Sequence, residues 1–341
     1  MTDSNTPLIL AWFPASKGGL SFRGTEVNLF DLAYFSEKLL GNKSIICLHK
    51  GSFNEPSVLE KFAKTFTSFI WFENTSDLER QLLEQKVDAF YTIRGGMKEE
   101  PMLEKIPMLV HAVYDMSEKH GLVYAGVSES VANKFGRPEY VPHMINLPDA
   151  DGDFRDILGI SENAIVFGRH GGNDTWDLSF AKETLLKVLN DREDIYFLFA
   201  VRPHILRDVS HPRLICLEAF SDLNIKRKFI NTFDGFLHAQ SLGESFGLSC
   251  GEASRANKPV IVWDGGALRE HLRILGDKCI KYKNADELYT ILTTFNRDEI
   301  QKKDWKAYGD YTPEKVMTLF SNVFLDPLRK HIAIKQSKES N

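Results

Sequence analysis

One segment of the sequence combines small residues and carboxylates in a pattern that could hold a phosphorylated ligand. An apolar run at 235–238 leads into a loop that contains Gly243, Glu244 and Gly247, and a helical pattern with Glu252 follows. Glycines let a loop backbone approach a ligand closely, and a helix start offers N–H groups and a dipole that favour anions. Glu244 and Glu252 cannot bind phosphate, but they suit hydrogen bonds from hydroxyl groups, as on ribose or a sugar ring. A plain strand–helix turn with a solvated glutamate and an ordinary helix charge explains the same residues.

The other metal-binding and phosphate-binding motifs considered are incomplete or absent. The acidic run from Asp149 to Asp153 begins like a calcium loop, but its sixth position is Phe154 and its twelfth is Ile160. Neither residue can serve there. The sequence has no H-E-x-x-H and no G-x-x-x-x-G-K-[ST] motif, and the ten histidines lack metal-ligand spacing. We therefore expect neither a metal ion nor a cofactor.

Composition and charge exclude several classes of protein. The 341 residues correspond to about two domains of ordinary size. The 42 Lys and Arg against 47 Asp and Glu give a net charge of −5, so the basic excess of a nucleic-acid-binding chain is absent. Charged residues at 26% and hydrophobic residues at 43% are typical of a globular protein.

Cysteine usage and hydropathy indicate a cytoplasmic protein. The four cysteines are scattered without a C-x-x-C pair, which fits a reducing compartment. The apolar run at 8–15 is too short to span a bilayer and has no basic segment before it. The basic run 226–228 is expected to be a solvated helix face, with contact to an anionic lipid surface as the alternative. We expect at most peripheral contact with a membrane and no nucleic-acid partner.

Short apolar runs alternate with amphipathic stretches, which predicts parallel sheets covered by helices. Strands are expected at 8–13, 44–49, 69–72, 88–93, 108–112, 123–127, 164–167, 195–201, 214–217, 235–238, 259–263 and 279–281. The clearest helical patterns lie at 25–40, 180–190, 222–229, 248–256, 268–275 and 285–295, and a last helix begins at Thr312.

The proline-rich segment 140–148 interrupts this alternation and predicts a domain boundary near residue 145. We expect one α/β domain at 1–145 and a second at 146–311, followed by a C-terminal helix at 312–330 and a polar, frayed tail at 331–341. Ligands of open parallel sheets bind at the carboxyl ends of the strands. The cleft between the two domains is therefore the default site.

The glycine-rich loop resembles a known signature. Gly243-Glu-Ser-Phe-Gly-Leu248, with Glu252 beyond it and Lys258-Pro-Val-Ile261 after that, is similar to the E-x7-E motif of retaining GT-B glycosyltransferases, particularly family 4. The resemblance implies the GT-B fold, with two Rossmann-like α/β/α domains whose parallel sheets face an interdomain cleft. It covers most of the chain, from Trp12 to about Phe324, in the expected order. It implies that the domain at 1–145 binds the acceptor, that the domain at 146–311 binds the nucleotide sugar, and that the helix at 312–330 packs back on the first domain.

The resemblance also assigns roles within the loop. It implies that Glu244 contacts the donor sugar and that Glu252 binds the ribose hydroxyl groups. The backbone amides of Phe246, Gly247 and Leu248 would hold the distal phosphate.

A second segment resembles the strand that opens the donor domain of this family. That strand ends in Gly168-Arg169, and the resemblance assigns Arg169 to the diphosphate. The family usually has a lysine five residues later, where this chain has Asp174, so Arg202 is a candidate for the second cation. A surface charge at a strand end is the alternative for Arg169.

Two segments in the first half of the sequence also resemble this family. The loop from Gly18 to Glu26 resembles the family's glycine-rich loop for acceptor and phosphate, with Gly19, Arg23, Gly24 and Thr25 as its candidates, although helix capping alone explains Gly and Thr there. The strand-end His111 is similar to a histidine that lies near the reacting sugar. A satisfied structural histidine is the alternative for His111. His238 is a weaker candidate that could merely support its turn.

These resemblances imply a metal-independent enzyme that moves a sugar from a nucleotide-diphosphate sugar to a hydroxyl group of a glycan or lipid-linked glycan, with retention. Its catalytic residues would be Glu244, His111 and Arg169. Surface-glycan synthesis is the family's usual setting.

Two alternatives stay open. The chain could be another GT-B enzyme, such as a nucleotide-sugar epimerase, or a degenerate GT-B protein that binds a nucleotide without turnover, which the missing lysine at position 174 would explain.

Overall fold

The computed structural model describes residues 6–15 and 17–339, and these form two compact units. One unit comprises the residues up to Met144 together with those from Tyr311 onward, and the other is Ile145–Asp310.

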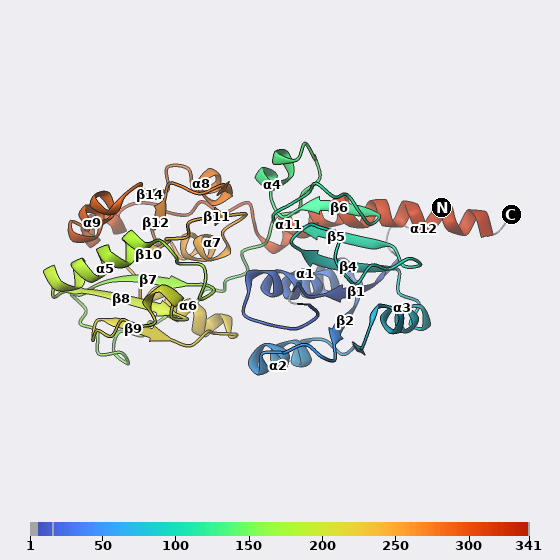
Figure 1. The fold of residues 1–341 in the computed structure, drawn as a ribbon, viewed down its shortest axis with the longest axis horizontal. Coiled ribbons are helices and arrows are strands. Elements are labelled where there is room, and N and C mark those ends of the chain that lie inside the picture. The colour runs from blue at the N-terminus through green and yellow to red at the C-terminus, as the bar shows by residue number, and fades with distance from the viewer. Residues whose placement is uncertain (1–5, 16, 340–341) are drawn as a thin grey trace. The chain divides into compact units, whose positions relative to one another are not determined.

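The first unit is built on one parallel sheet of six strands (Figure 1). In spatial order these are β3 (Phe69–Phe72), β2 (Lys43–His49), β1 (Ile9–Phe13), β4 (Ala89–Arg94), β5 (Met108–Ala112) and β6 (Val123–Gly126). The helices of this half are α1 (Gly24–Leu40), α2 (Pro56–Thr65), α3 (Thr75–Glu84) and α4 (Glu129–Lys134). All six side chains of β4 are buried, as expected for a parallel strand with both faces covered.

The second unit repeats this architecture. Its sheet has the order β14 (Cys279–Tyr282), β12 (Val260–Trp263), β10 (Gly235–Leu237), β7 (Ile165–His170), β8 (Ile195–Ala200) and β9 (Leu214–Leu217). Its helices are α5 (Ser179–Asp191), the short η1 (His204–Leu206), α6 (Leu223–Asn231), α7 (Leu248–Arg255), α8 (Glu270–Leu275), α9 (Ala285–Thr293) and α10 (Arg297–Gln301). When the strands of each unit are numbered along the chain, both sheets have the Rossmann order 3-2-1-4-5-6.

The apolar runs predicted the strands of both sheets, mostly to within one residue. The largest difference is β7, which continues for three residues past Phe167 to His170. Gly168 fits there because a Cβ would lie 2.0 Å from the ring of Phe233. Arg169 and His170 continue the strand because both polar side chains find partners inside the unit, which a pattern of apolar residues cannot indicate.

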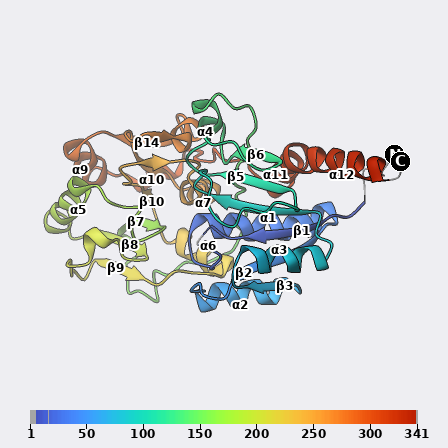
Figure 2. The same cartoon turned by 45° about the vertical axis from the view of Figure 1, so that its right-hand side comes forward.

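The C-terminal segment packs on the first unit. Thr312 caps α11 (Pro313–Phe320) as expected, a π-helical turn at Ser321–Leu325 follows, and α12 (Asp326–Glu339) continues from it. Helix α11 contacts α1, while Figures 1 and 2 show α12 extending beyond the sheet of this unit. The helix thus continues through most of the stretch that we expected to be a frayed tail from residue 331, because that stretch is rich in good helix formers. Residues 340 and 341 of that tail lie outside the described residues.

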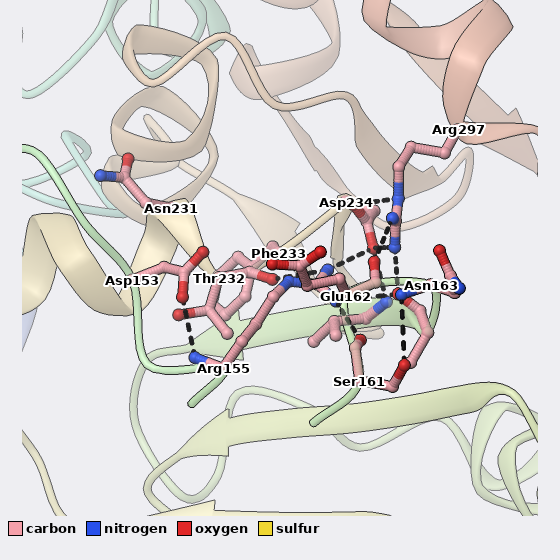
Figure 3. Close-up of polar contacts among 12 residues, drawn as sticks. Asp153, Arg155, Ser161, Glu162, Asn163, Asn231, Thr232, Phe233, Asp234 and Arg297 are labelled. Atoms are coloured by element: carbon pink, nitrogen blue, oxygen red, sulfur yellow. Dashed lines mark hydrogen bonds and ion pairs between the residues drawn. The ribbon is translucent and has the colours of Figure 1, made fainter. Parts of the chain in front are cut away.

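A buried ion-pair network stabilises the second unit at the amino ends of β7 and β10 (Figure 3). Asp234, which precedes β10, pairs with Arg155 at 2.8 Å and with Arg297 at 2.9 Å. Arg155 also donates to the carbonyl oxygens of Ser161 and Ala164. The network therefore joins three segments of the unit at the end of the sheet opposite the carboxyl ends of the strands.

We expect Asp234→Asn to lower the free energy of unfolding by about 2 kcal/mol. Breaking a buried ion pair usually costs more, but both arginines keep bonds to carbonyl oxygens here. Denaturant unfolding of the two proteins measures the difference. Asp149→Asn is the control, because Asp149 is 73% exposed and its pairs with Arg227 and Arg255 should contribute less than about 1 kcal/mol. Equal losses in the two variants would contradict a special role for Asp234.

Candidate functional site

The topology of the second unit points to the carboxyl ends of β7 and β10. These two strands are neighbours at the place where the strand order reverses, and ligands of such sheets bind outside the carboxyl ends there. Strand β7 ends with Arg169 and His170, and β10 is followed directly by His238. Three polar side chains therefore lie at the switch point of the sheet.

Helix α7 begins beside these strand ends. Gly247, its N-cap residue, has φ 86° and ψ 60°, a left-handed conformation that favours glycine. A Cβ on Gly247 would lie 2.8 Å from the Cβ of His271. Within the described residues no side chain caps α7, so no cap competes with an anion for the N–H groups of its first turn. The preceding Phe246 is fixed by a 3.1 Å hydrogen bond from the Tyr308 hydroxyl to its carbonyl oxygen.

Glu244 is held more firmly than a flexible loop would allow. The short strand β11 (Gly243–Glu244) pairs with β13 (Leu268–Arg269) in parallel register. A Cβ on Gly243 would lie 2.0 Å from the carbonyl oxygen of Leu268, so only glycine permits this approach. We expected a helix from residue 268, but α8 begins only at Glu270 because the first two residues form this ladder.

Glu252, on α7, lies at the centre of a buried polar group of three side chains. Its Oε2 is 2.5 Å from His170 Nε2 and its Oε1 accepts a hydrogen bond from Lys226 Nζ at 2.8 Å. Burial alone would raise the pKa of the Glu252 carboxyl, but Lys226 and His170 outweigh it and hold this pKa at about 2. Burial also lowers the pKa of His170, although its bond to Glu252 opposes the effect. Glu252 is therefore an ionised acceptor with its orientation fixed from two sides.

Lys226 was missed as a site residue by sequence reasoning. The side chains of Lys226 and Arg227 are only 13% and 14% exposed, so two residues of the basic run are not part of the solvated helix face that we expected, whereas Lys228 is exposed. Asp222 caps α6, and the first turn of this helix brings Lys226 to Glu252. No local signal in the sequence distinguishes Lys226 from its neighbours. Only the fold places it near the glutamate 26 residues later.

Arg169 is buried and turned toward the loop that follows β7. Its guanidinium donates to the carbonyl oxygens of Val201 and Gly172 and to the Thr175 hydroxyl. Burial lowers the pKa of Arg169 to about 10, and the nearby Glu244 and Asp174 oppose this effect. Arg169 thus lies in the same electrostatic environment as Glu244, while it orders the loop that follows β7.

Arg202 lies in the loop between β8 and η1. Its Nη1 donates to the carbonyl oxygens of Leu206 and Val209 at 3.2 and 2.6 Å. Burial raises the pKa of the Cys216 thiol, and Arg202 and Arg169 both oppose this shift. The two arginines therefore approach the same strand, β9, and the role of Arg202 as second diphosphate ligand stays a prediction.

The candidate loop of the first unit follows β1, at the switch point of that sheet. Arg23 is the N-cap residue of α1 and is exposed, as is Gly24, whereas Gly19 is buried. The Thr25 hydroxyl donates to the buried carboxylate of Glu26 at 2.8 Å. A carboxylate therefore already occupies the first turn of α1, and the predicted contact of this loop with a phosphate stays a prediction.

His111 is a fully buried residue of β5 with both ring nitrogens hydrogen-bonded. Nδ1 lies 2.6 Å from the Tyr91 hydroxyl, and Nε2 lies 2.8 Å from the Val141 carbonyl oxygen. Burial lowers the pKa of His111 to about 4, so the ring is neutral at physiological pH. This geometry is that of a structural histidine. A catalytic role would require these bonds to break, and it stays a prediction.

The loop also contains a motif that sequence reasoning missed. Gly243-Glu-Ser245-Phe-Gly247 matches the G-x-S-x-G pattern of hydrolase nucleophile elbows. Such a serine needs a histidine within hydrogen-bond reach. Among the described residues no hydrogen bond joins Ser245 to a histidine, so the match does not support a hydrolase site.

Over residues 6–15 and 17–339, no group of three or more His, Cys, Asp or Glu side chains is placed to hold a metal ion. None of the helices in that part of the chain has both the length and the apolar character needed to cross a bilayer.

Comparison with known proteins identifies the fold. No family model matches the chain, and neither does any curated protein sequence. Among solved structures, HepE from Anabaena in complex with UDP-glucose superposes with a TM-score of 0.66 over 98% of this chain and 100% of that chain, at 14% identity. A glycosyltransferase from Rickettsia africae gives a TM-score of 0.64 over 99% and 100%, at 17% identity. The chain has the GT-B fold.

The same fold also includes enzymes of another type. A structure from Listeria monocytogenes described as a UDP-N-acetylglucosamine 2-epimerase gives a TM-score of 0.60 over 94% of this chain and 97% of that chain, at 12% identity. The structural similarity therefore establishes the two Rossmann-like units. It does not determine the reaction, which is inferred from the residues of the site.

Proposed function

We propose that this protein is a glycosyltransferase that moves a sugar from a nucleotide-diphosphate sugar to a hydroxyl group of a glycan or lipid-linked glycan, with retention of configuration. The observation that carries this proposal is the arrangement at the switch point of the second unit. There an uncapped helix start, suited to a diphosphate, lies with Glu244 and the ionised Glu252, which suit hydroxyl groups. The structural neighbours bound to UDP and UDP-glucose support it.

The central chemical step is cleavage of the bond between the sugar and the diphosphate. Negative charge grows on the leaving diphosphate, and the N–H groups at the start of α7 stabilise such charge. Arg169 adds a positive charge behind the same loop. The leaving phosphate itself can accept the proton of the acceptor hydroxyl, so the reaction needs no separate base. Surface-glycan synthesis, with at most peripheral membrane contact, is the setting that we propose.

Two other functions share the fold. A nucleotide-sugar epimerase is favoured by the likeness to the Listeria structure, and it would return an altered sugar without transfer. A nucleotide-binding protein without turnover is favoured by Asp174, which stands where the resembled family has a lysine. It is also favoured by Arg169, whose guanidinium donates to Gly172 in the loop after β7. Each alternative predicts a different product.

Incubation with a panel of nucleotide sugars separates these functions. Thermal shift first identifies the nucleoside diphosphate that binds, because a ligand of the native state raises the melting temperature. Product analysis by NMR then follows the sugar of that donor. The proposal predicts slow hydrolysis alone and faster sugar transfer with an acceptor. A sugar inverted at a ring carbon while still bound to the nucleotide would show an epimerase, and an unchanged donor would show a binding protein.

We expect donor turnover to remain near its untreated level in excess chelator. The proposed site uses a helix start and Arg169 against the diphosphate, and these need no divalent ion. Steady-state rates with and without EDTA measure this, with an ion-exchanged sample as control. A loss of activity that magnesium or manganese restores would contradict the metal-independent mechanism.

A further inference from the structure

Two buried histidines beside Glu244 have no part in the chemistry described so far. His238 follows β10 and is 4% exposed, and His271, in α8, is fully buried. Their ring centroids are 4.8 Å apart, with 44° between the planes. Both residues belong to the second unit, and both lie at the loop that carries Glu244 and Gly247.

Neither ring is held as His111 is. Among the described residues, none of the four ring nitrogens of His238 and His271 makes a well-formed hydrogen bond. The nearest approaches are to Glu244: its Oε1 lies 3.5 Å from His238 Nε2, and its backbone is a weak hydrogen-bond partner of His271. A buried polar atom without a partner destabilises the folded state. Nitrogens of this kind on two adjacent rings therefore suggest that the missing partners come from a ligand.

The protonation state of the His271 ring indicates what kind of ligand could supply these partners. Burial lowers the pKa of His271 to about 2, and the neighbouring His238 adds to this effect, so the ring is neutral at physiological pH. A neutral imidazole has one N–H donor and one acceptor nitrogen. A hydroxyl group can satisfy both, whereas a phosphate accepts but does not donate. Glu244 beside the rings accepts further hydrogen bonds and repels anions.

We propose that His238 and His271 form, together with Glu244, the subsite that hydrogen-bonds the hydroxyl groups of an uncharged sugar. The inference rests on the proposed function and adds to it the residues that determine sugar specificity. The diphosphate would bind separately, at the start of α7, where the nearest atom of His271 to a Cβ on Gly247 would be its Cβ, at 2.8 Å.

Replacement of His271 by phenylalanine tests this subsite. Phe keeps a ring of similar shape and removes both unpaired nitrogens, so we expect a melting temperature equal to or above that of the wild type. We also expect affinity for UDP to stay within about twofold, while affinity for UDP-glucose falls at least about tenfold, because its hydroxyl groups lose their partners. GDP and GDP-mannose form the parallel pair if the guanine nucleotide binds instead. Calorimetric titration measures each affinity.

Two further measurements guard against a variant that fails to fold. His238→Phe should give the same selective loss, and the wild type should bind at least one deoxy analogue of the donor sugar at least about tenfold more weakly than the parent. His120→Phe is the matched control, because His120 is also buried with an unpaired Nε2 but belongs to the first unit. It should change neither affinity.

The outcomes separate the subsite from the function. An unchanged affinity of His271→Phe and His238→Phe for the nucleotide sugar would overturn the subsite and leave the proposed function standing. An equal loss of nucleotide and nucleotide-sugar binding in a folded variant would also overturn it, since the rings would then only support the loop. A wild type that binds no nucleoside diphosphate would refute the proposed function, and the subsite with it.

Discussion

Replacing Glu252 with alanine is expected to lower the free energy of unfolding by about 3–5 kcal/mol, because it leaves Lys226 and His170 unpaired in a buried site. Denaturant unfolding measures this loss. Glu299→Ala is the control in the same unit, since Glu299 is 65% exposed in its pair with Lys302 and should contribute less than about 1 kcal/mol. A double-mutant cycle with Lys226→Met isolates the ion pair, and additive effects of the two changes would contradict it.

The same carboxylate is expected to recognise ribose. Wild-type protein should bind the ribonucleoside diphosphate more tightly than its 2′,3′-dideoxy analogue by about 2–3 kcal/mol, the scale of hydrogen bonds to a charged group. Glu252→Ala, titrated well below its melting temperature, should bind both ligands with the same affinity. A variant that keeps the wild-type preference would remove Glu252 from the ribose.

Lowering the pH should reduce the free energy of unfolding, because it protonates the Glu252 carboxylate. The pKa of Glu252 is about 2 in the folded state and has an ordinary value of 4.5, so the carboxylate stabilises the fold fully above about pH 4.5. That contribution is lost as the pH falls toward 2. The lowered pKa of His170 acts in the same direction, since protonation favours the unfolded chain once the pH falls below 6.5. The stability difference between wild type and Glu252→Ala should therefore shrink in acid.

Glu244→Gln is expected to lower kcat by about a hundredfold or more, while nucleoside diphosphate affinity stays within about threefold. Glu244 lies beside the proposed sugar position, and its negative charge stabilises a sugar that gains positive character in the transition state. Such a contact affects turnover more than ground-state binding. Gln keeps the length of the side chain near His238, so folding should not change.

Steady-state transfer and nucleotide titration on one preparation test this prediction. Ser245→Ala in the same loop is the control, because Ser245 has no proposed contact with the sugar and should leave kcat near its original value. If Glu244→Gln instead loses nucleotide affinity and keeps kcat, the two glutamates have the opposite roles.

The sequence predicts the sheets and the glycine-rich turn before α7 well, for physical reasons. Parallel strands that are buried on both faces appear as continuous apolar runs, and a glycine-rich turn before a helix is a local pattern. Gly243 and Gly247 both have the positive φ values that such a turn suggests, at 78° and 86°. These features depend on residues close together in the chain.

Side-chain partners across the fold could not be predicted in this way. Lys226 looked like one charge in a basic run, and only the fold brings its Nζ within 2.8 Å of the Glu252 carboxylate. Arg169 has the expected place at the strand end, but its direction depends on the carbonyl oxygens of the loop beyond it. His271 carries no local pattern at all, since its importance comes from the 4.8 Å contact with His238.

Release of nucleoside diphosphate by the purified protein tests the central claim most directly. The donor that gives the largest thermal shift is incubated with wild type and with Glu244→Gln, and free diphosphate is measured over time. The account predicts release by the wild type, acceleration by a sugar acceptor, and a rate at least about a hundredfold lower for the variant. Tight binding of the donor with no release by the wild type, with or without acceptor, would contradict the assignment as a glycosyltransferase.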